Sequence, residues 1–454
     1  MRKKIIIFMS LCLALTSVLS GCGGQNSSKD GEKKHIVVTF GKDEITGEVA
    51  EAETIFADYL AKHPDVEVEI NNLTATDPKM LAMIASGNAP DIIRLNAPSD
   101  VATYVMRNMI IPIDEYVEKS DVINMDDYYD VINLFRFDGK SVGKGDLYGL
   151  PKDWSIGSQM WINTALFEEN GVRIPTDEDP FTFEEFAEAA RKISKKNDDG
   201  TMAVIGADLG IGANYNYIEY MLSQQGKSYW KDDFSGTTTL TQQETKDAIK
   251  WFFDLQQQGA LTSKLNEISS TYAWFAEGKL GMWNQGYWAS AYFRDENTDM
   301  KIPLENVKLV PGPVFDKNNR KSSIMKATGG VISAQTKHPE TAYSVLEYMM
   351  TGALAEARAK KGFGFPIEKS KISLLPMANV IDEQAKLATD NDAKYLSYDM
   401  KYNPYVNASS IEASFNKYYI PALYGEMTLD EALKAMEEDI EILISEGKEI
   451  AGVE

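Results

Sequence analysis

The sequence is poor in the residues from which most metal centres and nucleophilic sites are built. Its 454 residues include two cysteines and three histidines, and the histidines stand apart at His35, His63 and His338. Two cysteines exclude a disulfide-dense scaffold and a zinc site made of several cysteines. Single, scattered histidines argue against a His-rich metal centre or a His-based triad. We therefore expect neither a metal ion nor another cofactor.

Positive charge is also scarce. Lys and Arg number 46 against 68 Asp and Glu, a formal net charge of -22. Binding to nucleic acid or to an anionic membrane through surface charge requires clustered Lys and Arg, so we expect neither. The hydrophobic share of 44% and the charged share of 25% are typical of a globular protein. They exclude a wholly disordered chain and a polytopic membrane protein.

The common catalytic signatures are missing as well. The chain has no G-x-S-x-G, H-E-x-x-H, C-x-x-C or G-x-x-x-x-G-K-[ST] segment. Gly210-Ile-Gly212 lacks the third glycine of a dinucleotide loop, and Asp390-Asn-Asp392 lacks the glycine and glutamate of an EF-hand. With 68 carboxylates a glycosidase pair stays possible, but nothing singles out two of them. We expect no enzyme, and keep a secreted carbohydrate-active enzyme as the alternative.

The N-terminus has the features of an export signal. Arg2, Lys3 and Lys4 precede the mostly apolar stretch 5–19, which is too short for a bilayer span of about 20 residues but typical of a signal-peptide core. It ends in Leu-Ser-Gly-Cys22, which resembles the lipoprotein box of bacteria, whose cysteine becomes lipidated. We predict a signal peptide at 1–21 and a lipid on Cys22. The alternative is an ordinary secretory signal with a chance cysteine.

Processing would leave a tethered, strongly acidic body. Loss of the three basic residues at the N-terminus takes the net charge from -22 to -25. Residues 22–34 are small, polar and charged, which predicts a flexible tether. Two or more acyl chains anchor a protein stably where one does not. We therefore expect an extracytoplasmic protein, lipid-anchored to the cell membrane, as in a Gram-positive bacterium.

From residue 35 the pattern alternates between strand and helix. We predict strands at 36–40, at 66–70 and from 91, with helices at 49–60 and 80–85 between them. Such a βαβαβ opening indicates an α/β fold with a mainly parallel sheet, whose ligands collect at the carboxyl ends of the strands.

Three later helices begin with a predicted capping box, in which a hydroxyl and a carboxylate three residues apart satisfy free N–H groups. These are Thr182 with Glu185, Thr241 with Glu244, and Thr428 with Glu431, which open amphipathic runs at 183–193, 248–255 and 432–443.

Aromatic side chains in polar loops suggest a sugar site. Trp154 follows Pro-Lys-Asp, while Trp283 and Trp288 flank Asn-Gln-Gly-Tyr. Sugars have apolar C–H faces and a polar rim, so their sites combine flat aromatic surfaces with carboxylates and amides. Core packing is the alternative for any one tryptophan, and it fits Trp251 and Trp274.

Several short motifs follow one another in the order of a known family. They are Ala-Ser-Gly-Asn-Ala-Pro-Asp at 85–91, Tyr-Gly-Leu-Pro at 148–151, Ile-Asn-Thr-Ala-Leu-Phe at 162–167, Pro-Phe-Thr-Phe-Glu-Glu-Phe at 180–186, Phe-Ala-Glu-Gly-Lys-Leu-Gly-Met at 275–282, and Gly-Tyr-Trp at 286–288. Pro-Gly-Pro at 311–313, Gly329-Gly330 and the helix with Glu-Tyr-Met-Met at 347–350 continue the series. The chain resembles the sugar-binding type (family 1) of bacterial extracellular solute-binding proteins, which serve ABC importers and include the maltose-binding protein.

This resemblance implies a two-lobed, periplasmic-binding-protein-like fold of type II, with hinge strands and a cleft between the lobes. It places residues 35–150 and 327–366 in an N-terminal lobe, and 151–326 and 367–454 in a C-terminal lobe. It implies a monomer that captures a carbohydrate, an oligosaccharide or related sugar, and delivers it to the permease subunits of an ABC transporter. A non-sugar solute or a sensor role remains open because the fold is shared across ligands. The insertion at 122–144 has no assigned role.

Position by position, the resemblance also predicts the residues that face the ligand, with Trp288 as the stacking aromatic and Gly329-Gly330 bringing backbone close to the ligand. The predicted set is Phe40, Lys42, Asp43, Asn96, Ser99, Asp153, Trp154, Asn214, Tyr215, Trp288, Gly329, Gly330, Tyr402 and Tyr405.

Overall fold

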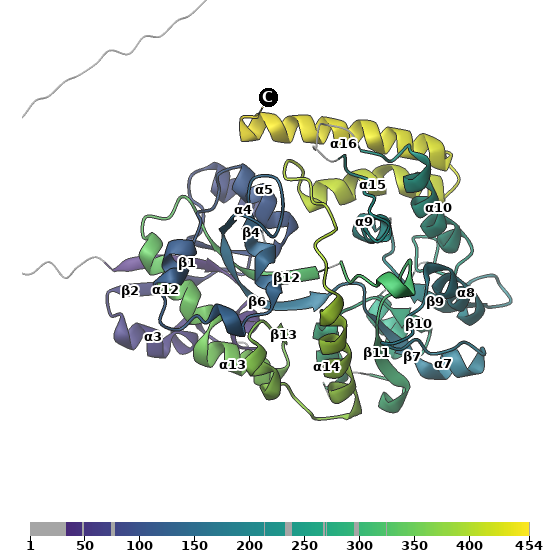
Figure 1. Cartoon of the computed structure of the whole chain (residues 1–454), viewed down its shortest axis with the longest axis horizontal. Helices are drawn as coiled ribbons and strands as arrows, with labels where there is room; N and C mark the ends of the chain where they lie inside the picture. Colours follow the sequence, from purple (N-terminus) through teal and green to yellow (C-terminus); the bar gives the residue numbers. More distant parts are fainter. Residues whose placement is uncertain are drawn as a thin grey trace, which may run out of the picture.

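The computed structural model describes residues 33–47, 50–73, 78–212, 214–231, 238–266, 268, 270–294, 299–323 and 325–453. The predicted signal peptide, Cys22 and all but the end of the predicted tether lie outside these residues. Two lobes lie side by side, each built on its own sheet (Figure 1). In the part of the chain that is described, no helix combines the length and the apolar character that crossing a membrane requires.

The first lobe is built on a six-stranded sheet with the order β13-β6-β12-β3-β1-β2. Its strands are β1 (Lys34–Thr39), β2 (Val66–Ile70), β3 (Ile92–Ala97), β6 (Gly149–Ile156), β12 (Met325–Ile332) and β13 (Phe365–Pro366). β1 runs parallel to β2 and β3, which confirms the parallel opening predicted from the sequence. β12 runs antiparallel to both of its neighbours, and β13 runs antiparallel to β6. The complete sheet is therefore mixed, and the prediction of a mainly parallel sheet is wrong beyond its opening.

Helices cover the faces of this sheet (Figure 1). They are α1 (Lys42–Thr46), α2 (Ala52–Ile55), α3 (Ala57–Lys62), α4 (Pro78–Ala85), α5 (Ser99–Met106), α6 (Asp114–Glu118), α12 (Pro339–Met350) and α13 (Gly352–Lys361). The single helix predicted at 49–60 is wrong in one respect, because α2 and α3 are separated at Phe56. That ring is fully buried and packs against Tyr348 at a centroid distance of 5.9 Å, with its backbone outside helical geometry at φ -99° and ψ 12°.

The second lobe is built on a five-stranded sheet with the order β11-β7-β10-β9-β8. Its strands are β7 (Met160–Asn163), β8 (Lys195–Lys196), β9 (Met202–Asp208), β10 (Leu280–Trp283) and β11 (Val307–Val310). Its helices are α7 (Thr164–Glu169), α8 (Phe183–Ile193), α9 (Tyr215–Ser223), α10 (Gln243–Gln257), α11 (Thr271–Ala276), α14 (Val380–Asp392), α15 (Ala408–Leu423) and α16 (Leu429–Ala451). The α/β, two-lobed fold class predicted from the sequence is confirmed.

Two of the three predicted capping boxes are confirmed, at Thr182 and Thr428. The one predicted at Thr241 is wrong, because α10 begins at Gln243 and its N-cap residue makes no side-chain hydrogen bond. The backbone N–H of Thr241 donates instead to Glu437 at 3.0 Å, and Glu244 faces Lys227 at 3.5 Å. A capping box that the sequence analysis missed opens α14 at Asn379.

Three connections join the lobes, after β6, before β12 and after β13. The first two touch, because a side chain on Gly312 would collide with the carbonyl of Ser158. The predicted lobe boundaries at 150/151 and 326/327 fall within β6 and β12, strands of the first sheet, and the boundary at 366/367 coincides with the end of β13.

The insertion at 122–144 packs on the first lobe. It contains the 3-10 helices η1 (Met125–Asp127) and η2 (Asp130–Phe135) and begins the hairpin of β4 (Arg136–Phe137) and β5 (Asp146–Leu147). Phe135 is fully buried, and a side chain on Gly329 of β12 would collide with it. Tyr129 lies against Trp154 with ring centroids 5.1 Å apart. The insertion therefore packs against β6 and β12, the strands next to two of the connections to the second lobe.

Candidate functional site

A cavity of about 850 Å³ lies between the two lobes. The first lobe contributes the ends of β3 and β6, the start of α5 and part of β12, while the second lobe contributes α9, the 3-10 helix η3 (Tyr287–Phe293) and the start of α15. The carboxyl end of β3 opens into this cavity, as expected for a parallel sheet. Its lining residues are Glu44, Arg94, Asn96, Ala97, Pro98, Ser99, Asp100, Lys152, Asp153, Trp154, Ser155, Tyr215, Asn216, Trp288, Ala291, Tyr292, Lys326, Thr328, Phe363, Gly364, Tyr402, Ala408, Ser409 and Glu412.

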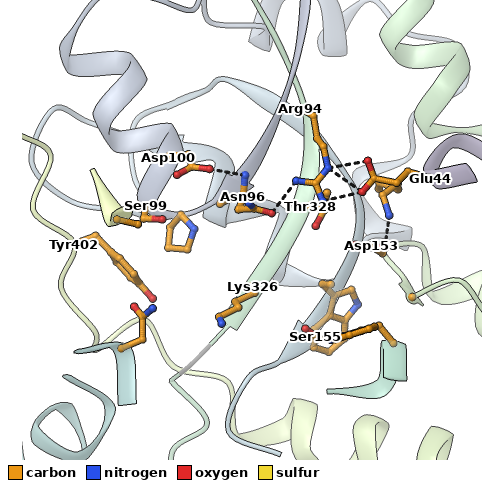
Figure 2. Close-up of a pocket in the computed structure, with 18 of the residues that line it drawn as sticks. Glu44, Arg94, Asn96, Ser99, Asp100, Asp153, Ser155, Lys326, Thr328 and Tyr402 are labelled. Carbon is orange, nitrogen blue, oxygen red and sulfur yellow. Dashed lines mark hydrogen bonds and ion pairs between the residues drawn. The ribbon is translucent and has the colours of Figure 1, made fainter. Parts of the chain in front are cut away.

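On the first-lobe wall, Arg94 is held by two partners. Its guanidinium makes a 2.7 Å ion pair with Glu44 and donates to the side-chain oxygen of Asn96 at 3.2 Å (Figure 2). Burial alone would raise the pKa of Glu44, but the hydrogen bond and charge of Arg94 lower it below its usual value. The pair is therefore charged at neutral pH and fixes the direction of both side chains.

Asp100 holds the loop between β3 and α5. Its carboxylate is buried and accepts the backbone N–H of Asn96 at 2.9 Å (Figure 2). Burial raises the pKa of Asp100, against the pull of that hydrogen bond and of Arg94. This contact fixes the backbone at Asn96, whose side chain lines the cavity beside Arg94.

A second ion pair lies on β6, between the adjacent side chains of Lys152 and Asp153. Lys152 also lies over the ring of Phe363 at 5.0 Å. Gly364 has φ +87°, and any side chain on it would collide with Asp153, so only glycine lets the loop after α13 approach this carboxylate. Lys152 and Asp153 therefore neutralise each other.

Trp288 supplies an open aromatic surface on the second-lobe wall. Its side chain is 41% exposed, and its ring lies 5.9 Å from that of Tyr292 in an edge-to-face arrangement. Tyr292 stacks on Tyr272 at 4.3 Å, and both lie against the buried ring of Trp283. A row of aromatic rings thus runs from the core of the second lobe to the cavity and supports Trp288 from behind.

The turn before Trp288 is held by the connection between the lobes. Trp161 donates its indole N–H to the carbonyl of Gly286 at 3.1 Å, and Asn284 donates to the carbonyls of Gly157 and Gln159 at 2.8 and 2.9 Å. Trp288 therefore keeps a fixed position relative to the end of β6.

Trp154 is placed differently from Trp288. It lines the cavity, but it is only 2% exposed and its indole N–H donates to the carbonyl of Pro366 at 3.0 Å. It packs edge-on against Phe365 at 5.3 Å. Trp154 therefore belongs mainly to the core beneath the cavity, with little ring surface open to a ligand.

Half of the predicted ligand-facing residues come together at the cavity. Those that line it are Asn96, Ser99, Asp153, Trp154, Tyr215, Trp288 and Tyr402. The other half lie elsewhere. Phe40 is fully buried in the first core, and Tyr405 packs against Gly447 of α16. Asn214 caps α9, accepting from Tyr217 at 3.1 Å and donating to the carbonyl of Leu209 at 2.6 Å.

The remaining predicted positions belong to the first lobe. Lys42 pairs with Glu51. Asp43 belongs to α1, and its side chain is not among those described. Gly329 and Gly330 approach the backbone of Leu150 and the side chain of Leu346 so closely that neither position has room for a side chain. Packing against β6, the helix α12 and the insertion accounts for both glycines.

Several lining residues were not predicted from the sequence. Tyr292 follows Trp288 at a spacing of four, which places two residues on one face of a helix, so this signal was available. Arg94 lies in a predicted strand two residues before Asn96, and alternation along a strand could have found it. Nothing in the sequence pointed to Lys326 on β12, Phe363 after α13 or Glu412 on α15, which are brought to the cavity by the connections between the lobes.

The cavity offers hydrogen-bonding groups and aromatic faces. Among the residues described, no three His, Cys, Asp or Glu side chains are placed to hold a metal ion. Such a site can bind a polar, hydroxyl-rich molecule that also has apolar faces.

The family of this chain is shown by comparison with known proteins. The family model described as bacterial extracellular solute-binding protein matches residues 42–352. A curated arabinooligosaccharide-binding protein of Bacillus subtilis is 23% identical over 369 residues, which cover 77% of this chain and 76% of the relative. One of Halalkalibacterium halodurans is 24% identical over 225 residues, 49% of this chain, and the match spans about half of the relative, 47%.

Solved structures share the fold. An ABC substrate-binding protein of Listeria monocytogenes in complex with cycloalternan has a TM-score of 0.69 at 18% identity, covering 93% of this chain and 99% of that one. The sugar-binding protein MalE of Xanthomonas citri has a TM-score of 0.69 at 17% identity, covering 93% and 100%. With the family model over more than half of its length and this two-lobed fold, the chain belongs to the bacterial extracellular solute-binding proteins, a family of binding proteins.

Proposed function

We propose that this protein captures a carbohydrate, an oligosaccharide or related sugar, outside the cytoplasm and delivers it to the permease subunits of an ABC importer. The observation that carries the proposal is the pairing, in one cavity, of the exposed ring of Trp288 with the fixed polar groups on the first-lobe wall. An aromatic face suits the C–H face of a sugar ring, and the amide, carboxylate and guanidinium groups suit its hydroxyls. The names of the relatives support the same ligand class.

The proposed mechanism is capture between two lobes. A sugar that touches both walls makes more contacts when the lobes approach each other, so it shifts the population toward the closed form. The importer would then recognise the closed pair of lobes. Binding without turnover is expected, since the chain belongs to a family of binding proteins.

Attachment to the membrane is part of the same proposal. A lipid on Cys22 would hold the body near its permease, while residues 22–34 would give it reach. The protein would work as a monomer in this arrangement. Labelling of the expressed protein with a radioactive fatty acid tests the anchor: we expect label on the natural sequence and none on Cys22→Ser, and equal labelling of both would remove the lipid from the proposal.

Calorimetric titration with a panel of ligands tests the sugar. The panel includes arabino-, malto- and manno-oligosaccharides, a free ketose, a hexitol, and a peptide and a polyamine as non-sugar ligands. We expect at least one carbohydrate to bind, and Trp288→Ala to weaken that binding. If only a non-sugar ligand binds, the family membership stands but the carbohydrate is wrong. Release of reducing ends from a bound oligosaccharide would instead favour a carbohydrate-active enzyme.

A further inference from the structure

Glu219 is a buried carboxylate behind the second-lobe wall of the cavity. It lies on α9 and is 1% exposed. One carboxylate oxygen accepts the hydroxyl of Ser228 at 2.6 Å and the backbone N–H of Lys401 at 3.1 Å, while the other accepts the backbone N–H of Tyr229 at 3.1 Å. A single side chain thus joins three separate segments of the chain.

Burying this carboxylate is unfavourable for folding unless its hydrogen bonds are well placed. A buried carboxylate loses its hydration, and only well-placed donors compensate for that loss. Burial raises the pKa of Glu219 to about 7, even though the hydrogen bonds from Ser228, Lys401 and Tyr229 act in the opposite direction. An apolar residue of the same volume could be buried at a lower free-energy cost. The carboxylate is therefore explained by the three segments that its hydrogen bonds join.

The Lys401 bond lies in the extended segment 396–407, which leads from the second-lobe helix α14 to α15 (Figure 1). Three of its contacts lie between residues 398 and 401. The hydroxyl of Tyr398 donates to the carbonyl of Asp130 in the first lobe at 2.5 Å, Asp399 pairs with Lys321 at 2.5 Å, and Lys401 is bound by Glu219. The next residue after Lys401 is Tyr402, which lines the cavity.

Tyr402 reaches the cavity from this segment, on the same side as Ser99 of the first lobe (Figure 2). Its position depends on the backbone immediately before it, and that backbone is fixed by Glu219. The titratable groups that face Glu219 are Lys401, Tyr229 and Tyr402. Lys401 favours the charged carboxylate, whereas burial raises the pKa of both tyrosines and the charge of Glu219 raises it further.

We propose that Glu219 is a positioning residue for the binding site: its carboxylate clamps the backbone of Lys401 to α9 and thereby sets Tyr402 in the second-lobe wall of the cleft. Glu219 itself does not line the cavity. The consequence for affinity rests on the carbohydrate-binding function proposed above, whereas the clamp is a property of the free protein.

The variant Glu219→Gln tests the clamp because an amide cannot replace a carboxylate here. Its single oxygen can accept from either Lys401 or Tyr229, and its NH2 group then faces the other N–H. Asp208→Asn is the matched control. Asp208 is a buried carboxylate of the same lobe that accepts from Thr262 at 2.5 Å and from the backbone of Gly210 at 3.2 Å, away from the cavity.

Hydrogen exchange of the ligand-free protein gives the first readout. In Glu219→Gln we expect peptides covering residues 400–403 to exchange about tenfold faster, with α15 unchanged. Asp208→Asn should leave 400–403 unchanged. If Glu219→Gln does not fold, Ser228→Ala removes one of the three bonds more gently and should speed the same peptides by a smaller factor. Unchanged exchange at 400–403 in a folded variant overturns the clamp.

A double-mutant cycle on ligand affinity gives the second readout. Glu219→Gln should weaken binding of the carbohydrate found in the panel several-fold, at roughly the level of one lost hydrogen bond, and should have no further effect in a Tyr402→Ala background. Additive effects would mean that Glu219 acts through stability and not through Tyr402, which overturns its role in positioning. If no sugar binds at all, the proposed function fails, and the exchange experiment still decides the clamp.

Discussion

On the first-lobe wall of the cleft, Arg94 and Lys152 project from strands, and each is neutralised by a carboxylate beside it. On the second-lobe wall, Trp288 and Tyr402 project from a 3-10 helix and an extended segment. The sheet fixes the polar groups of the first wall by its own geometry. The aromatic groups of the second wall depend instead on buried anchors outside the cavity, namely Trp161 and Asn284 for Trp288 and Glu219 for Tyr402.

This difference suggests that the two walls contribute differently to ligand binding. Ion-paired groups on strands are already oriented and lose little freedom on binding, which favours directional hydrogen bonds to hydroxyls. The aromatic rings of the second wall supply broad apolar contact area, and their buried anchors keep them in place as the lobes approach. We therefore expect the second wall to dominate affinity and the first to dominate selectivity among sugars.

The largest effect is expected from Trp288→Ala. Loss of a stacking aromatic at the centre of a site costs about 2 kcal/mol or more, a factor of roughly 30 in affinity. Stability should change by no more than about 0.5 kcal/mol because the ring is 41% exposed. Titration calorimetry measures the first and thermal unfolding the second.

The matched control is Phe315→Ala, a change to a large ring that is 52% exposed and does not line the cavity. It should alter neither affinity nor stability appreciably. Equal losses of affinity in the two variants would contradict the idea that the second wall carries the binding energy.

The comparison of the walls also explains how much of the site could be predicted from sequence. The strand order at the N-terminus, the family motifs and the exposed Trp288 follow from local patterns, because periodicity and turn chemistry are local properties. Trp154 has a similar local setting, after Pro-Lys-Asp, but it packs beneath the cavity. Its burial is decided by Tyr129 and Phe365, which are distant in sequence. Gly329-Gly330 likewise meets Phe135 and Leu346, so the insertion explains part of that motif.

Other parts of the site depend on the return of the chain from the second lobe. Lys326 lies on β12, which the chain enters on its return from the second lobe, and Phe363 and Gly364 come just before β13; both strands pair with β6. The partners of a residue across such long separations leave no local pattern. The capping box at Thr241 shows the same limit on a smaller scale, since the motif is present but Glu437 of α16 takes the backbone N–H of Thr241.

A smaller loss of affinity is expected from a substitution on the first-lobe wall. Arg94→Met leaves Glu44 partly buried without its cation, so we expect both a loss of affinity of about tenfold and a loss of stability of about 1–3 kcal/mol. Glu44→Gln combined with Arg94→Met should recover much of the stability but not the affinity, because the charge is removed while the donor to the ligand is still missing. Recovery of both would show that Arg94 acts only through packing.

The pH dependence of the unfolding free energy distinguishes Glu219, which anchors the second wall, from the more exposed carboxylate of Glu185. The pKa of Glu219 is raised from 4.5 to about 7 by burial, so the native state holds its proton more tightly than the unfolded state does. Between about pH 4.5 and pH 7 this group therefore lowers the unfolding free energy as pH rises, by at most ~1.4 kcal/mol per pH unit. The slope should be weaker in Glu219→Gln, as measured by chemical denaturation at several pH values.

Glu185 provides the contrasting case. Burial would raise its pKa, but the N–H of Thr182 and the side chains of Lys317 and Arg173 lower it to about 2. Its stabilisation is complete above about pH 4.5 and is lost as pH falls through about 2, so Glu185→Gln should leave the slope between pH 4.5 and 7 unchanged. A slope that is identical in the wild type and Glu219→Gln would contradict a buried, proton-holding anchor.

The smallest effect is expected from Lys326→Met, at the floor between the two walls. Lys326 is exposed to the cavity, and among the described residues it has no ion-pair partner. Although burial between the lobes lowers the pKa of Lys326, its side chain faces the open cavity. It should therefore add only one hydrogen bond to a neutral sugar, and we expect a loss of affinity of about threefold to fivefold with little dependence on salt. A loss larger than that of Trp288→Ala, and one that fades at high ionic strength, would mean that the ligand is anionic. Lys326, and not the aromatic residues of the second-lobe wall, would then contribute most to affinity.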